Sequence, residues 1–182
     1  GNVDIIVFRL NLTADTKAPI QILAGNGKGD FVDATNIIFN NNIPNTNFVA
    51  RAIIKDLNND GKDDVFCIES GMDIPPYTGA QNRLLLSDNS GHLIDSSNLL
   101  PQQLLYSHGA AIGDVNNDGL QDILINTLTP VANDLEIQNK SGYFLSSSSL
   151  LPINVTANPF GSGTTNATNT WSALIDVNRD GY

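Results

Sequence analysis

The sequence DLNNDGKDD at residues 56–64 recurs almost unchanged as DVNNDGLQD at residues 114–122. A further copy, DVNRDGY, occupies residues 176–182, and GNVD at residues 1–4 matches the second half of the same pattern. The glycines of the pattern are separated by 60, 58 and 62 residues; they are Gly1, Gly61, Gly119 and Gly181. Self-similarity at a fixed period indicates a repeat architecture. The chain is therefore predicted to be built from repeats of about 60 residues.

Short apolar segments flank each copy of the pattern. Ala52-Ile53-Ile54 precedes the first copy, and Val65-Phe66-Cys67-Ile68 follows it. The second copy lies between Ala110-Ala111-Ile112 and Ile123-Leu124-Ile125, and Ser172-Ala173-Leu174-Ile175 precedes the third. Apolar runs of this length, bounded by turn residues, predict buried strands.

Farther along each repeat, an apolar segment leads into a turn that contains glycine. These turns lie at residues 25–29, 88–91 and 139–142. Asn-Gly and Ser-Gly pairs favour hairpins because the central residues of such turns need positive φ. No segment has a helical period with caps. Each repeat is thus predicted to supply about four short antiparallel strands, which is typical of a β-propeller blade; a stacked solenoid is the structural alternative.

The expected fold class is therefore all-β, with about three blade-like repeats. We place a partial blade at residues 1–46, complete blades at 47–105 and 106–168, and the first strand and partial loop of a next blade at 169–182. A closed ring needs at least four blades. We therefore expect these repeats to be a fragment of a larger propeller, whose other blades come from a longer chain or by association.

The repeated pattern D-x-N-x-D-G-x-x-D offers oxygen atoms at the spacing that a calcium loop requires. Calcium takes six to eight oxygen ligands at about 2.3–2.6 Å. In a curled loop, the side chains at positions 1, 3 and 5 point toward one centre; here these are Asp56, Asn58, Asp60 in one loop and Asp114, Asn116, Asp118 in the other. The predicted backbone carbonyl ligands are Lys62 and Leu120, and the carboxylates that close the sites are Asp64 and Asp122. The incomplete loops offer weaker candidates, which are Asp4, Asp176, Asn178 and Asp180.

Calcium also fits the chemistry of these loops better than other metals do. Several carboxylates come this close together only if a cation offsets their repulsion, so binding should stabilise the fold. Zinc is disfavoured because neither loop contains His or Cys, and magnesium usually retains more water. An EF-hand or dockerin needs flanking helices and a Glu at position 12, where this chain has Cys67 and Ile125.

Composition excludes several other classes of function. The formal net charge of −10 argues against nucleic acid as a partner. Ten of the nineteen acidic residues belong to the repeated pattern: Asp4, Asp56, Asp60, Asp63, Asp64, Asp114, Asp118, Asp122, Asp176 and Asp180. No apolar run approaches the roughly 20 residues that span a bilayer. Cys67 is the single cysteine, so no intrachain disulfide forms, and we predict that it is a small buried core residue.

These repeats resemble the FG-GAP and VCBS-type repeats of integrin α-subunit-like β-propellers and of many bacterial surface proteins. The resemblance rests on residues 56–64 and 114–122, on the apolar runs before them, and on downstream segments such as residues 82–91. It implies that the calcium loop joins the first two strands of a blade and that the ion is structural. The Phe-Gly and Gly-Ala-Pro signature that names the family is not spelled out here.

The resemblance leaves more than one function open, since one fold hosts many functions. The first expectation is an extracellular, cell-surface or periplasmic module that acts in adhesion, with a protein or glycan ligand at the cell surface or matrix. A lectin propeller is one alternative, and its candidate ligand-binding residues are Tyr77, Tyr106, His108, Phe160 and Trp171. An accessory propeller of a secreted enzyme is another. We expect no catalysis from this chain, because His92 and His108 occupy unrelated positions and no nucleophile motif is present.

Overall fold

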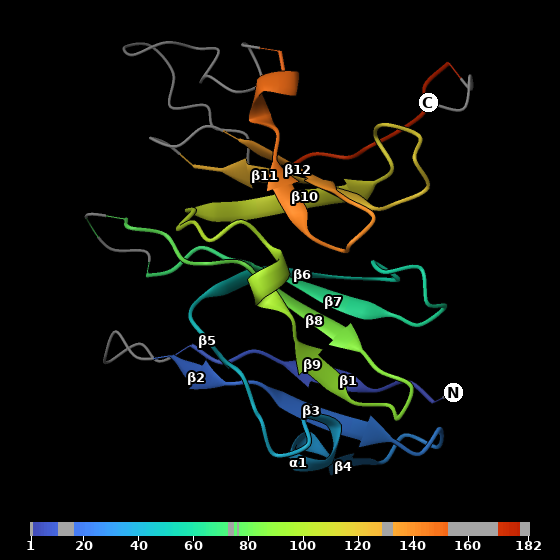
Figure 1. The fold of residues 1–182 in the computed structure, drawn as a ribbon. Helices are drawn as coiled ribbons and strands as arrows, with labels where there is room; N and C mark the ends of the chain where they lie inside the picture. The colour runs from blue at the N-terminus through green and yellow to red at the C-terminus, as the bar shows by residue number, and fades with distance from the viewer. Residues whose placement is uncertain are drawn as a thin grey trace.

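The computed structural model describes residues 2–10, 17–72, 75, 77–128, 133–152 and 171–178. Within these ranges the protein is an all-β molecule whose three main antiparallel sheets follow one another along the chain. Figure 1 shows the sheets stacked one on another, from the blue N-terminal sheet to the orange C-terminal one. This order is the one expected for successive propeller blades, which are thus confirmed as the building units.

The first sheet has three strands in the order β1-β3-β4. Its strands are β1 (Ile5–Val7), β3 (Gln21–Gly25) and β4 (Phe31–Asp33). One helical turn, α1 (Thr35–Ile38), follows β4. Two short strands outside this sheet pair with each other; they are β2 (Ala18–Pro19) and β5 (Asn45–Thr46).

The second and third sheets are four-stranded meanders with the same layout. The second contains β6 (Val49–Lys55), β7 (Asp64–Glu69), β8 (Arg83–Ser87) and β9 (Leu93–Asp95), followed by the 3-10 turn η1 (Ser97–Leu99). The third contains β10 (Ser107–Gly113), β11 (Asp122–Thr127), β12 (Asp134–Gln138) and β13 (Phe144–Ser146), followed by η2 (Ser148–Leu150). Each candidate metal loop joins the first two strands of its sheet.

The second sheet is buried on both faces, because the other two sheets pack against it. Side chains alternate between the faces of a strand. In β7, Phe66 and Ile68 therefore enter the core shared with the third sheet, whereas Val65 and Cys67 enter the core shared with the first. Cys67 is fully buried, as the sequence predicted. Truncating a buried aromatic side chain such as Phe66 should cost about 3–5 kcal/mol.

Two strand predictions need correction. Residues 172–175, predicted to form a buried strand, have no strand pairing in the described part of the chain, and Ile175 is exposed. A strand needs a neighbouring ladder to satisfy its backbone groups, and the described residues provide none for this segment. Likewise, Ile54 in the predicted buried run of β6 is largely exposed, because no sheet formed by the described residues covers it at that end. No helix in the described ranges has the length and apolar character of a membrane span.

Candidate metal-binding loops

The two complete loops connect β6 to β7 and β10 to β11. The strands on either side of each loop pair in the same register: Lys55 pairs with Asp64, and Gly113 pairs with Asp122. Figure 1 shows both loops on one side of the stack, the same side on which the N-terminus lies. The repeat therefore places its polar loops on the same side of the stacked sheets.

The first half of each loop curls so that polar side chains gather around one backbone N–H. In the first loop, the N–H of Asp60 donates to Oδ1 of Asp56 (3.1 Å) and to Oδ1 of Asn58 (3.0 Å). The N–H of Gly61 donates to the second carboxylate oxygen of Asp56 (2.8 Å). The predicted ligands at positions 1, 3 and 5 are thus brought together by local hydrogen bonds.

The second loop repeats this arrangement. The N–H of Asp118 donates to Oδ1 of Asp114 (3.1 Å) and of Asn116 (3.0 Å), and the N–H of Gly119 donates to Asp114 (2.7 Å). Partial desolvation acts to raise the pKa of Asp114, yet the N–H groups of Gly119 and Asp118 hold that pKa below its ordinary value. Asp114 is therefore ionised at neutral pH, the form in which a carboxyl group binds calcium.

Two positions of each loop require positive φ. Gly61 and Gly119 both have φ of 84°, and nothing within 4 Å would meet a Cβ at either residue. The requirement for glycine is therefore conformational and does not arise from crowding. Asn59 and Asn117, two residues earlier, both have φ of 59°, a region that Asn tolerates better than most residues. The repeated Asn and Gly thus explain why the loop has the same shape twice.

The closing carboxylates are buried and bonded to the protein. Asp64 accepts hydrogen bonds from the N–H of Leu57 (2.8 Å), and from the N–H (2.8 Å) and hydroxyl (3.2 Å) of Ser87. Asp122 accepts equivalent bonds from the N–H groups of Val115 and Gln138, both at 2.9 Å. Burial raises the pKa of both carboxyls, against the effect of these bonds. Each side chain therefore ties the start of its loop to the third strand of its sheet.

Asp4 occupies the same place in the first sheet. Its Oδ1 accepts a hydrogen bond of 2.9 Å from the N–H of Gly25, the last residue of β3. Ser87 and Gln138, the last residues of β8 and β12, donate in the same way to Asp64 and Asp122. Asp4 is thus the structural counterpart of the ninth loop position, in keeping with the sequence pattern.

The donor set of each loop fits calcium, because it consists of carboxylate and amide oxygens, which hard cations prefer. In the described residues, no group of three or more Asp, Glu, His or Cys side chains is arranged to hold a metal ion. Each loop instead offers two carboxylates, from Asp56 and Asp60 in the first, together with the amide oxygen of Asn58. A carboxylate has about four lone-pair sites, so Asp64, which accepts three bonds, retains capacity for one ligand bond.

The backbone carbonyls of Lys62 and Leu120 remain predicted ligands. Asp176 and Asn178 lie in the described segment 171–178, beside the third sheet, whereas Asp180 lies outside the described residues.

The loops also contact each other, which the sequence did not reveal. The side-chain amide of Asn59 donates to the carbonyl of Gly119 at 2.7 Å. The side-chain amide of Gln138 donates to the buried carbonyl of Leu57 at 3.0 Å. A pattern within one repeat cannot show bonds between repeats; the only available signal was the polar residue at position 4 of both loops.

The aromatic candidates form two separate contacts. Tyr77 and Tyr106 have ring centroids 5.4 Å apart, and Tyr106 contacts His108 edge-on at 4.6 Å. The guanidinium of Arg51 lies 5.6 Å from the ring centroid of Trp171. Phe160 lies outside the described residues. Tyr106 directly precedes β10, so the Tyr77–His108 group lies at the end of the strand opposite the metal loop.

Comparison with known families gives one result. The sequence model of an FG-GAP-like repeat matches residues 1–67 and again residues 56–125. Both matches include the first complete loop, and the second also includes the whole of the loop at residues 114–122. No curated protein matches the chain.

Proposed function

Because the chain belongs to the FG-GAP-like repeat family, we propose that it is a calcium-binding β-propeller module of an extracellular or cell-surface protein. Calcium has a structural role in this proposal: it holds each loop between the first two strands of a blade. The rigid blades then present their surface to a protein or glycan ligand. The module itself is non-catalytic.

One observation carries the proposal, namely the identical curl of the two loops. The N–H of Asp60 donates to Oδ1 of Asp56 and of Asn58, and the N–H of Asp118 donates to Oδ1 of Asp114 and of Asn116. A loop that gathers its ligand oxygens before any cation arrives loses little conformational entropy on binding. When bound, the ion would offset the repulsion between the carboxylates, and the net charge of −10 would fall in magnitude.

The calcium affinity expected for such loops supports an extracellular location. Calcium sites of extracellular modules have dissociation constants of about 10⁻⁴–10⁻³ M, which suit millimolar calcium outside cells. The described ranges contain no helix that could cross a membrane, which is compatible with a module that is exported or held at the surface by another part of its protein.

Calorimetric calcium titration and thermal melting of the full chain test the proposal. We expect about two equivalents to bind at the complete loops and to raise the melting temperature, because the folded state binds the ion and the unfolded state does not. The double variant Asp60→Ala with Asp118→Ala should lose both effects. Asp63→Ala is the matched control, since it removes an exposed charge from the first loop without removing a predicted ligand.

The absence of heat and of a melting shift at millimolar calcium would contradict the proposal, and so would equal binding by the double variant. If calcium binds as expected, ligand specificity is tested next with glycans and matrix proteins, with calcium and with chelator. We expect binding only in calcium if the ion keeps the blades rigid.

A lectin is the second candidate function, favoured by the contacts of Tyr106 with Tyr77 and with His108. Aromatic faces suit sugar rings, and Tyr77 is partly exposed. Tyr77→Ala should abolish glycan binding if this group is the sugar site. Loss of glycan binding should leave calcium binding unchanged, because the group lies away from the metal loops.

A further inference from the structure

Two acidic side chains of β12, those of Asp134 and Glu136, are buried between the second and third sheets. In the register of the third sheet, Asp134 lies opposite Ile125 and Glu136 lies opposite Ile123. Residues directly opposite each other share one face of a sheet, and both isoleucines belong to the core that the second and third sheets share. The two acids are therefore directed into that core, where Asp134 is 4% and Glu136 is 2% exposed.

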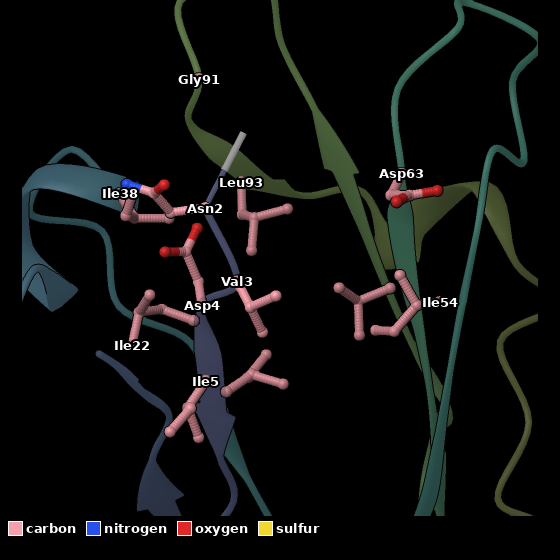
Figure 2. Close-up of a pocket in the computed structure, with 12 residues that line it drawn as sticks. Asn2, Val3, Asp4, Ile5, Ile22, Ile38, Ile54, Asp63, Gly91 and Leu93 are labelled. Atoms are coloured by element: carbon pink, nitrogen blue, oxygen red, sulfur yellow. The ribbon is translucent and has the colours of Figure 1, made fainter. Parts of the chain in front are cut away.

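The second sheet has different residues at these two places. By its register with the second strand of each sheet, Arg83 corresponds to Asp134, and Leu85 corresponds to Glu136. Leu85 belongs to the apolar core between the first and second sheets. Figure 2 shows part of that layer, in which isoleucine and leucine side chains line a cavity of about 520 Å³. The third sheet thus has one acid in the place of a cation and a second acid in the place of a leucine.

The two acids have no cationic side chain as a partner within the described part of the chain. The ion pairs that the described residues form all lie elsewhere in the fold. Residues 100–150 contain a single Lys or Arg, which is Lys140, and its side chain is exposed in a turn. Burial raises the pKa of Glu136 to about 8, and the like charge of Asp134 adds to this shift. Buried charges in proteins are paired or coordinate a metal ion.

Hydrogen bonds satisfy Asp134 but not Glu136. Oδ1 of Asp134 accepts bonds from the hydroxyls of Ser146 (2.6 Å) and Ser148, and Oδ2 accepts one from the side-chain amide of Gln103. The side chain of Gln103 also bonds to the carboxyl group of Glu136, so both acids are directed at one amide. Oε2 of Glu136 has no hydrogen-bond partner among the described residues. A buried, unpartnered oxygen therefore lies beside the carboxylate of Asp134 and its two hydroxyl partners.

A buried polar atom without a partner is one sign of a bound water or ion. The charges favour an ion here, and a monovalent one. Three hydrogen bonds offset the charge of Asp134, which leaves only that of Glu136 to be balanced.

The number of available oxygens also favours a monovalent ion. The two carboxyl groups and the hydroxyls of Ser146 and Ser148 offer about five oxygen ligands, counted from their free lone pairs. Calcium takes six to eight oxygens, and magnesium retains several waters.

We propose that the buried acid cluster of Asp134, Glu136, Ser146 and Ser148 binds an alkali metal cation between the second and third sheets. Glu136 balances the charge of the ion through Oε2, and Asp134 and the two hydroxyls complete its oxygen ligands. The ion joins β12, β13 and η2. It replaces in the third sheet the guanidinium of Arg83, which in the second sheet bonds to the carboxylate of Asp95 in β9.

The buried acid cluster is separate from the metal loop of the same sheet. Asp134 is the first residue of β12, whereas Gln138, the last residue, is the one that bonds to Asp122 of the loop. Occupation of the cluster is therefore expected to be independent of calcium in the loops.

Thermal melting of the full chain in the chloride salts of sodium, potassium and choline tests the proposal, at one fixed total salt concentration. The melts are measured at about pH 9, above the pKa of Glu136, so that protons compete little with the cation. We expect the melting temperature to be higher in sodium or potassium than in choline by about 2–4 °C. A shift of this size is expected for a chain of this length when the cation concentration is about five times the dissociation constant.

Each melt is run with saturating calcium and again with a chelator that contains no alkali ion. The difference between the salts should be the same in both series. A difference that disappears when calcium fills the loops would place the alkali ion at the loops and overturn the inference.

Glu136→Gln removes the charge with little change of shape, and its melting temperature should be the same in all three salts. Glu136→Leu introduces the residue type that the second sheet has at this place, and it should behave in the same way. Asp63→Asn is the matched control, because it makes an acid-to-amide change at an exposed residue. This variant should retain the full difference between the salts. Circular dichroism checks that each variant is folded.

Equal melting temperatures of the wild type in the three salts would overturn the inference. A sodium or potassium effect that both Glu136 variants retain would overturn it as well. Neither result depends on calcium binding at the complete loops, so this inference and the proposed function can fail separately.

Discussion

Asn59 donates a hydrogen bond of 2.7 Å from its side-chain amide to the backbone carbonyl of Gly119, which lies 60 residues further along the chain. Asn59 is the fourth residue of the first metal loop, and Gly119 is the sixth residue of the second. The two loops of neighbouring blades are therefore in direct contact. Ordering one loop should favour the ordered conformation of the other, because they share this bond.

This contact predicts positive cooperativity between the two calcium sites. Asn59→Gly removes the bond while allowing the positive φ at this position, so calcium should then bind to the two loops independently. The expected loss of coupling is about 1 kcal/mol, the net worth of one hydrogen bond. A two-site calorimetric titration with calcium measures this coupling free energy.

Asn117→Gly is the control. It makes the same backbone change in the second loop but keeps the Asn59 bond, and should retain the cooperativity. Unaltered coupling in Asn59→Gly would contradict the prediction.

The two loops should also differ in affinity because of one residue. The ammonium group of Lys62 lies 3.2 Å from Oδ2 of Asp60, whereas Leu120 has the same position in the second loop. Calcium must displace this internal cation to use that oxygen. Hydrogen bonds from Lys62 also hold the pKa of Asp60 down, although desolvation acts to raise it.

We expect Lys62→Met to tighten calcium binding at the first loop by about two- to fivefold, the range set by exposed ion pairs. The backbone N–H of residue 62, which donates to Asp60, is retained. Titration in an Asp118→Ala background isolates the first loop. Lys62→Arg keeps the charge and should bind as weakly as the wild type; tighter binding by the Arg variant would show that charge is not the cause.

The local features of the fold could be predicted from sequence because they depend on residues close together in the chain. The curl of residues 56–64 needs only the Asp, Asn and Gly of its own pattern, and the hairpin at residues 88–91 needs only its own turn residues. Both were predicted correctly in place and type, and so was the burial of Cys67.

Features that depend on distant residues could not be predicted in this way. Asp64 was predicted as a metal ligand from its spacing, but its bonds to Ser87 involve a strand 23 residues away. The segment at residues 172–175 has the composition of a buried strand, yet burial requires a neighbouring strand that composition cannot provide. No pattern indicated that Arg83 would pair with Glu69.

Arg83 in β8 links β7, β9 and the separate strand β5 through three partners. Its Nε lies 3.1 Å from Oε1 of Glu69, and it also bonds to the carboxylate of Asp95 (2.5 Å) and the carbonyl of Asn45 (2.9 Å). Glu69 is only 1% exposed. Burial raises the pKa of Glu69, against the bonds from Asn47 and Arg83.

Arg83→Met should therefore lower the free energy of unfolding by about 3–5 kcal/mol, because it leaves a buried carboxylate without its cation. Urea unfolding in calcium measures the change. The double variant Arg83→Met with Glu69→Gln should recover part of the loss, since the uncompensated charge is then absent. A double variant no more stable than Arg83→Met would show that lost packing, and not the buried charge, dominates.

Glu136 in β12 is the most unusual buried group of the third sheet. It is 2% exposed and stands where the second sheet has Leu85. Its Oε2 has no hydrogen-bond partner among the described residues. Burial, with the charge of nearby Asp134, raises the pKa of Glu136 to about 8, although a hydrogen bond from Gln103 opposes the shift.

This shift predicts a fall in stability as the pH rises. Between pH 4.5, the ordinary pKa of the group, and about 8, the folded protein retains a proton that the unfolded chain has released. The free energy of unfolding therefore decreases through this window and levels off above it. Glu136→Gln should remove this contribution and be more stable than the wild type at pH 9 by about 1–3 kcal/mol, because no charge is buried.

Urea unfolding of both proteins from pH 4.5 to 9 gives the difference between their free energies of unfolding. The contributions of other titrating groups cancel in this difference. If the two proteins keep a constant difference across this range, Glu136 is ionised in the fold, and a cation or a bound water must then compensate its charge.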